Sequence, residues 1–210
     1  MCLLMMLTAS PPTMAQAADD PNINAQLLVA ARNEDLPRLE QLLKRGAAVN
    51  SRNRLGKTSL TMACEKGNDA MAAALIGAGA DVNLATVEGV TPLMAASYKG
   101  NVATVKRLLA AGARVDGTDH IRKTAPVYAA GQGNTAALEA LLASGVDVNA
   151  TYDHKLTLLM WAAGQGQADT VRMLLARGAD TSLRDDRDKS AADIAREAGT
   201  GDAVAAAGLR

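Results

Sequence analysis

A period of 33 residues runs through this sequence and constrains its fold more than any other feature. Threonine or serine, alanine, glycine and a pair of large aliphatic residues each recur at that spacing over five units. The recurring positions are Thr58, Thr91, Thr124, Thr157 and Ser190; Ala63, Ala96, Ala129, Ala162 and Ala195; Gly67, Gly100, Gly133, Gly166 and Gly199; Leu42-Leu43, Leu75-Ile76, Leu108-Leu109, Leu141-Leu142 and Leu174-Leu175; and Gly46, Gly79, Gly112, Gly145 and Gly178. Such self-similarity predicts a solenoid, because each unit buries its apolar face only by stacking on its neighbours.

Each unit is expected to begin with a short helix. In the unit that starts near residue 89, Thr91 is a good N-cap and Pro92 suits the first helical position. This helix is expected to run to about Lys99 and to stop at Gly100.

A second helix follows in the same unit. Asn101 can cap it, and Gly112 is expected to end it in a left-handed conformation. Its apolar residues fall on one face of the helix: Val102, Val105, Leu108 and Leu109. The polar stretch that follows predicts a turn or hairpin that leads to the next unit.

The repeated pattern resembles the ankyrin repeat family. The third unit reads "GVTPLMAASYKG…LLAAGARVD", the second "GKTSLTMACEKG…LIGAGADVN", and the fourth and fifth "KTAPVYAAGQG…LLASGVDVN" and "LTLLMWAAGQG…LLARGADTS". The resemblance implies an all-α solenoid of five to six helix-turn-helix units with hairpin loops and polar end caps. The expected ankyrin domain spans residues 24–203, with units at about 24–55, 56–88, 89–121, 122–154 and 155–187 and a C-terminal cap at 188–210.

The sequence departs from the family pattern at a few positions. Arg122 and Lys155 replace the glycine that opens a unit, and Pro126 replaces a leucine, so we expect distorted turns there. The first unit lacks the T-P-L start, and the last one has a shortened second helix. Both ends therefore resemble the polar caps that a solenoid needs for solubility.

The N-terminal 17 residues differ in character from the repeats. They carry no charge, begin with a short apolar run, and end in Ala15-Gln16-Ala17. This pattern is typical of a secretory signal cleaved after Ala17, which would make the protein periplasmic or secreted, with a linker at residues 18–23. No Lys or Arg precedes the apolar run, which favours a start codon further upstream. A disordered apolar N-terminus is the alternative.

Composition excludes several partners. Lys plus Arg and Asp plus Glu both total 22, so the chain lacks the basic excess that nucleic acid or an anionic membrane surface requires. The apolar N-terminal run is shorter than the roughly 20 residues of a membrane span. Cys64 would be the single cysteine of an exported chain, so no internal disulfide is expected, and a small packed residue is favoured over a reactive thiol. The sequence suggests no cofactor or metal site, and we expect a monomer.

The resemblance implies a protein partner, bound through loop tips and the exposed side of each first helix. The residues expected to contact it are Arg54, Lys57, Met62, Glu88, Tyr98, Lys99, His120, Tyr128, Gln132, His154, Trp161 and Gln165. Tyr128 and Trp161 occupy equivalent positions, and Tyr98 lies on the same helical face, so three of the four aromatic residues are expected to line one concave groove. A packing role for Trp161 between neighbouring first helices stays open beside a binding role.

Alternative functions are predicted only weakly. His120 and His154 lie in neighbouring loops beside Asp119 and Asp153, which allows a weak metal or acid–base site. The chain has no phosphate loop, catalytic triad or paired-carboxylate motif, so we expect no enzyme activity. An exported binding module that supports or protects a partner enzyme is the main prediction, and an inhibitor or immunity protein that blocks a toxic enzyme is the alternative.

Overall fold

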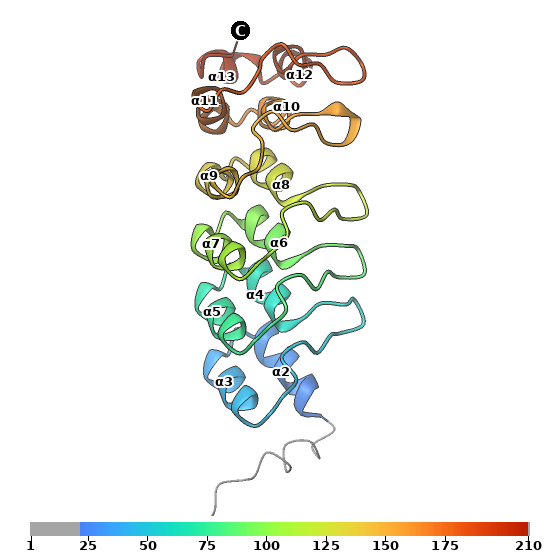
Figure 1. Cartoon of the computed structure of the whole chain (residues 1–210), viewed down its shortest axis with the longest axis vertical. Coiled ribbons are helices and arrows are strands. Elements are labelled where there is room, and N and C mark those ends of the chain that lie inside the picture. Colours follow the sequence, from blue (N-terminus) through green and yellow to red (C-terminus); the bar gives the residue numbers. More distant parts are fainter. Residues whose placement is uncertain (1–21, 210) are drawn as a thin grey trace, which may run out of the picture.

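The computed structural model describes residues 22–209, and in this part of the chain it contains twelve α-helices in six consecutive pairs (Figure 1). The predicted all-α solenoid of helix-turn-helix units is confirmed. The predicted signal segment and most of the linker lie outside the described residues. The pairs are α2 (Ile23–Arg32) with α3 (Leu36–Lys44), α4 (Ser59–Lys66) with α5 (Asp69–Gly77), α6 (Pro92–Lys99) with α7 (Val102–Ala110), α8 (Ala125–Gly131) with α9 (Thr135–Ala143), α10 (Leu158–Gly164) with α11 (Ala168–Ala176), and α12 (Ala191–Glu197) with α13 (Gly201–Ala205).

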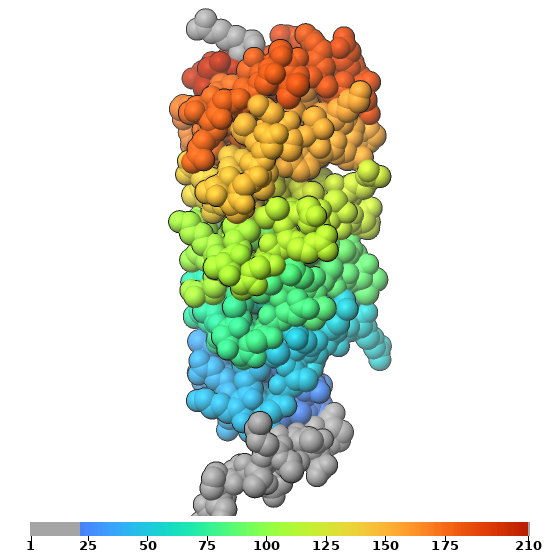
Figure 2. Space-filling model, in the orientation of Figure 1, coloured from blue at the N-terminus to red at the C-terminus, as the bar shows by residue number. Residues whose placement is uncertain are grey.

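The pairs stack along the long axis of the molecule. The first helices of the units form one row, the second helices form a row on one side of it, and the connecting loops project on the other side (Figure 1). Each first helix contacts the first helices of the adjacent units. The space-filling view shows the units as successive bands in chain order (Figure 2). Within residues 22–209, none of the helices combines the length and the apolar character that a membrane span requires.

The helix boundaries follow the repeated polar residues. The hydroxyl groups of Thr58, Thr91 and Thr157 each accept a hydrogen bond from the backbone N–H three residues further on, as N-caps do. Gly67 and Gly100 end α4 and α6 in the left-handed conformation, with φ of 74° and 75°. The last unit ends early, since α13 has 5 residues where α11 has 9.

The residue that begins each second helix also joins neighbouring units. Asn101 caps α7 through its side-chain oxygen, while its amide nitrogen donates to the Gly67 carbonyl of the preceding unit at 3.1 Å. Asn134 donates to the Ser97 carbonyl at 2.8 Å, and Gln167 donates to the Gly131 carbonyl at 3.1 Å. The exposed carbonyls at the end of one first helix are therefore satisfied by the next unit.

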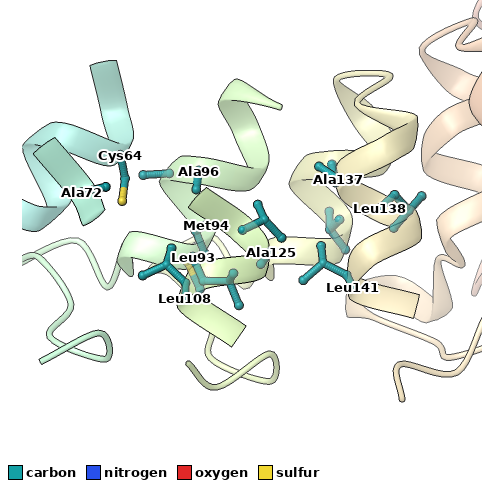
Figure 3. Close-up of a cluster of buried hydrophobic side chains, with 14 of the residues drawn as sticks. Cys64, Ala72, Leu93, Met94, Ala96, Leu108, Ala125, Ala137, Leu138 and Leu141 are labelled. Atoms are coloured by element: carbon teal, nitrogen blue, oxygen red, sulfur yellow. The ribbon is translucent and has the colours of Figure 1, made fainter. Parts of the chain in front are cut away.

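The core is a row of leucine layers with alanine between them. The large side chains that are fully buried include Leu27, Leu39, Leu42, Leu60, Met71, Leu75, Leu93, Met94, Leu108, Leu138, Leu141 and Leu158. Figure 3 shows part of this row, with Ala72 beside Cys64 and Ala137 beside Leu138 and Leu141. Cys64 lies in the same core at 1% exposure, and burial raises the pKa of its thiol to about 12, which keeps it protonated. The packed role predicted for Cys64 is confirmed.

The loops between units form five hairpin fingers, at residues 49–57, 82–90, 115–123, 148–156 and 181–189. In each finger the N–H of the fifth residue donates to the carbonyl of the ninth. The donor–acceptor pairs are Asn53–Lys57 (3.0 Å), Thr86–Val90 (2.9 Å), Asp119–Lys123 (3.0 Å), Tyr152–Leu156 (2.9 Å) and Asp185–Lys189 (3.0 Å).

The third finger keeps the regular turn, although a distorted turn was expected from Arg122. Arg122 adopts φ of 61°, close to the values of the glycines at the same position, 72° at Gly56 and 80° at Gly89. The Asp119 carboxylate accepts the N–H groups of Ile121 and Lys123 and thereby holds this turn. That expectation was wrong for the third finger.

The fourth finger is distorted, as expected. Tyr152 stands where Asp119 stands in the third finger, and its side chain makes no comparable bond to the turn. The tip forms a 3-10 turn, η1 (Asp153–Lys155), in which His154 and Lys155 both have positive φ, 56° and 57°. A single antiparallel bridge joins Thr151 to Thr157 at the base of this finger.

Candidate protein-binding groove

A groove lies between the fingers and the first helices of the central units. Two adjoining depressions, of about 330 and 260 Å³, form it, and both are lined by Tyr98 and Tyr128. The first is also lined by Glu65, Val90, Met94, Ala95 and Lys99. The second is also lined by Lys123, Val127, Gly131, Gln132, Trp161 and Gln165.

The aromatic side chains of α6, α8 and α10 lie in a row in this groove. Tyr98 and Tyr128 meet edge to face, with ring centroids 5.8 Å apart and planes at 81°. Tyr98 is 49% exposed, whereas Tyr128 and Trp161 are half-buried. The Trp161 ring packs against the core, as its packing role requires, and it also lines the second depression, where its binding role stays a prediction.

A buried carboxylate connects the groove floor to the third finger. The Tyr128 hydroxyl donates to the Asp119 carboxylate at 2.5 Å, and Asp119 is 6% exposed. Burial and this hydrogen bond hold the pKa of the Tyr128 phenol far above its usual range. From the sequence, Asp119 is noted only as a neighbour of His120. Asp119 is equivalent in the repeat to Asn53 and Asp185, whose side chains cap the turns of their own fingers. That equivalence was the signal that could have identified Asp119 as a turn cap.

Lys123 completes the row between two aromatic rings. Its Nζ atom lies 4.8 Å from the ring centroid of Trp161 and 5.7 Å from that of Tyr128. Both distances lie in the range of cation–π attraction. The ammonium group of Lys123 therefore lies against the two rings of the groove, and the residue as a whole is half-buried.

Six of the residues predicted to contact a partner lie together in this groove: Tyr98, Lys99, Tyr128, Gln132, Trp161 and Gln165. Four others are exposed on the fingers, outside the two depressions: Arg54, Glu88, His120 and His154. Lys57 is half-buried and pairs with Glu65 at 2.8 Å. Met62 is 8% exposed and packs in the core, so it offers little surface to a partner.

The two histidines have separate surroundings. Nδ1 of His120 lies 3.3 Å from the Glu88 carbonyl oxygen. Nδ1 of His154 lies 3.0 Å from the Asp186 carboxylate, and the hydrogen bond to Asp186 raises the pKa of His154. Within residues 22–209, no group of three or more His, Cys, Asp or Glu side chains is placed to hold a metal ion. The weak metal or acid–base site at these two histidines stays a prediction.

Comparisons with known proteins agree with this architecture. A family model of ankyrin repeats (three copies) matches residues 27–119 and 116–185. The structure is similar to the crystal structure of EF0377, an ankyrin repeat protein, with a TM-score of 0.77 and 26% sequence identity over 86% of this chain and 96% of that one. No match was found among the curated proteins.

Proposed function

Because the chain belongs to the ankyrin repeat family, whose repeats are protein–protein interaction modules, we propose that it binds one partner protein through the groove and the fingers. In this proposal it performs no chemistry of its own. The chain holds an enzyme in the periplasm as its partner, and it supports or protects that enzyme.

The aromatic row carries the proposal. Tyr98 leaves 49% of its surface in solvent at the centre of the groove, beside Tyr128 and the half-buried Trp161. Tyrosine and tryptophan are the residues most enriched at binding hot spots, because they bury a large area and lose little side-chain entropy. The repeat does not require an aromatic residue at the position shared by Tyr128 and Trp161, since Met62 and Ala95 occupy the same position in other units.

Crosslinking in cells that produce the chain, followed by purification, tests the proposal. One partner should be recovered in a fixed ratio from the exported fraction. Tyr98→Ala should weaken its capture about tenfold or more, as loss of a hot spot does. The control is Lys106→Ala, because Lys106 lies on α7 and lines neither groove depression. Equal capture by the two folded variants would remove the groove from the proposal.

Export is tested on the same material. The apolar segment that ends in Ala15-Gln16-Ala17 supports cleavage before Ala18. N-terminal sequencing of the protein from the periplasmic fraction should therefore begin at Ala18. Recovery of the intact N-terminus from the cytoplasmic fraction would contradict export. The binding proposal would then still be decided by the capture experiment with Tyr98→Ala.

A further inference from the structure

A lysine recurs as the last residue of three fingers, and two of these lysines form an ion pair with a glutamate of the helix that follows. Lys57 pairs with Glu65 at 2.8 Å, and Lys189 pairs with Glu197 at 2.6 Å. The two pairs are equivalent in the repeat. In each, the glutamate lies near the C-terminal end of the first helix that follows the finger.

Lys123 is the third lysine of this series, and its counter-ion is missing. Gly131 occupies the position equivalent to Glu65 and Glu197. No carboxylate in residues 22–209 lies within ion-pair distance of the Lys123 ammonium, which lies over Trp161 and Tyr128. The Asp119 carboxylate is engaged by two backbone N–H groups and by the Tyr128 hydroxyl.

The space that the missing side chain would fill is open. A Cβ atom added at Gly131 would meet nothing within 4 Å. Lys123 and Gly131 both line the second depression of the groove, and Lys123 is the one charged residue of that lining. The amide groups of Gln132 and Gln165 lie at the same depression and can donate hydrogen bonds.

We propose that the partner protein supplies the missing counter-ion: a carboxylate of an acidic segment occupies the space beside Gly131 and pairs with Lys123. The proposal rests on the proposed function and adds the chemistry of the bound segment. Lys123 is partly dehydrated against the two rings, so a carboxylate that enters this site gains more than it would from an exposed lysine. The pairs of Lys57 and Lys189 show that the fold accepts a carboxylate at this place.

A library of random linear peptides, selected on the full chain, tests this chemistry even while the partner is unidentified. The selected peptides should be enriched in Asp and Glu, and replacing those residues by Asn and Gln in a synthetic peptide should abolish binding. Trp161 is the single tryptophan of the chain, so its fluorescence reports occupancy of the depression directly.

Substitutions at Gly131 give a matched pair of variants. Gly131→Glu restores the intramolecular pair with Lys123 and should weaken the acidic peptide about tenfold or more. Gly131→Gln adds a side chain of the same size without the charge, and it should change affinity much less. Lys123→Met should weaken binding as Gly131→Glu does, whereas Lys106→Met on α7 should stay within about twofold. A cooperative thermal unfolding transition at or above that of the unmodified protein would show that each Gly131 variant is folded.

Each outcome decides between the two proposals. Peptides that bind in the groove, as shown by loss of binding in Tyr98→Ala, but that lack acidic residues would overturn the counter-ion proposal and leave the proposed function intact. Equal weakening by Gly131→Glu and Gly131→Gln would overturn it as well, since size and not charge would then be responsible. Selected peptides whose binding depends on no groove residue would contradict both proposals.

Discussion

Two glycines in equivalent turns differ in what surrounds them. Gly67 and Gly100 have nearly the same φ, 74° and 75°. A Cβ atom at Gly67 would meet nothing within 4 Å, whereas at Gly100 the Asn134 side-chain oxygen would be too close for any Cβ atom. Asn134 cannot move away freely, because its amide nitrogen donates to the carbonyls of Ser97 and Tyr98.

We therefore predict that Gly100→Ala destabilises the protein more than Gly67→Ala. Both variants carry the cost of a left-handed alanine, about 1–2 kcal/mol. Gly100→Ala additionally disturbs the hydrogen bonds of Asn134, at a further cost of about 1–2 kcal/mol. Urea unfolding followed by circular dichroism measures both free energies. Equal destabilisation by the two variants would show that Asn134 moves aside without loss.

The pH response of His154 is a second property that belongs to a single residue. Its hydrogen bond to Asp186, at 3.0 Å, raises the pKa of the imidazole. The pairing therefore stabilises the folded state fully below the unfolded pKa of about 6.5, and this stabilisation is lost as the pH rises through the folded pKa. NMR titration should give a pKa for His154 above 6.5, and Asp186→Asn should lower it. The same pKa in both proteins would contradict the pairing.

At the scale of helices, the repeated threonines are not equivalent caps. Thr157 begins α10, and its hydroxyl accepts the N–H of Met160 at 3.2 Å. Thr124 begins α8 in the same register, but its hydroxyl is buried and has no hydrogen-bond partner within residues 22–209.

Alanine at these two positions should therefore have different effects. Thr157→Ala removes a working cap and should cost about 1 kcal/mol. Thr124→Ala removes a buried hydroxyl that has no partner and should be neutral or slightly stabilising. Thermal unfolding of the two variants compares them directly. A similar loss in both would mean that the Thr124 hydroxyl forms a bond that the structure does not contain.

Most of the elements could be predicted from the sequence, because caps and breakers are local signals. The predicted helix from Thr91 to Lys99 and its stop at Gly100 agree with α6. The turn at Arg122 could not be predicted in this way, since its regular shape depends on the Asp119 carboxylate.

At the groove, the shared face of Tyr98, Tyr128 and Trp161 followed from the period. The position of Lys123 between two rings did not, because it depends on how the third finger folds back over α8 and α10.

The loops between units also carry a hydrogen-bond ladder with one break. Asn50, Asn83 and Asn149 each accept the backbone N–H of a residue in the next unit, at 2.8 to 2.9 Å. Asp116 occupies the same register, but its carboxylate pairs with Arg114 in its own loop. The third and fourth fingers also lack the backbone bond that joins the other neighbouring fingers within the described chain.

Asp116→Asn should restore this ladder. An asparagine can accept the N–H of Asp147 without bringing a second negative charge next to that residue, and the gain should be about 1 kcal/mol. Hydrogen exchange at the Asp147 amide should become slower. The reverse substitution, Asn83→Asp, should accelerate exchange at the Arg114 amide, whose bond to Asn83 it weakens. Unchanged exchange at both amides would show that the ladder contributes nothing to local stability.

For the whole molecule, stability is expected to be the sum of contacts between adjacent units, since each unit touches only its neighbours. The last unit tests this additivity. Val204 and Leu209 are both 2% exposed, and helix α13 contacts α11 of the preceding unit.

Removal of residues 201–210 withdraws these side chains and should cost about 3–5 kcal/mol by the usual value for one buried valine and one buried leucine. Hydrogen exchange followed by mass spectrometry should then accelerate in α10, α11 and α12. Exchange in α2 to α5 should be unchanged, because α13 packs against α11 and α12, in the last two units. An equal acceleration along the whole chain would instead mean that the six units unfold as one cooperative body.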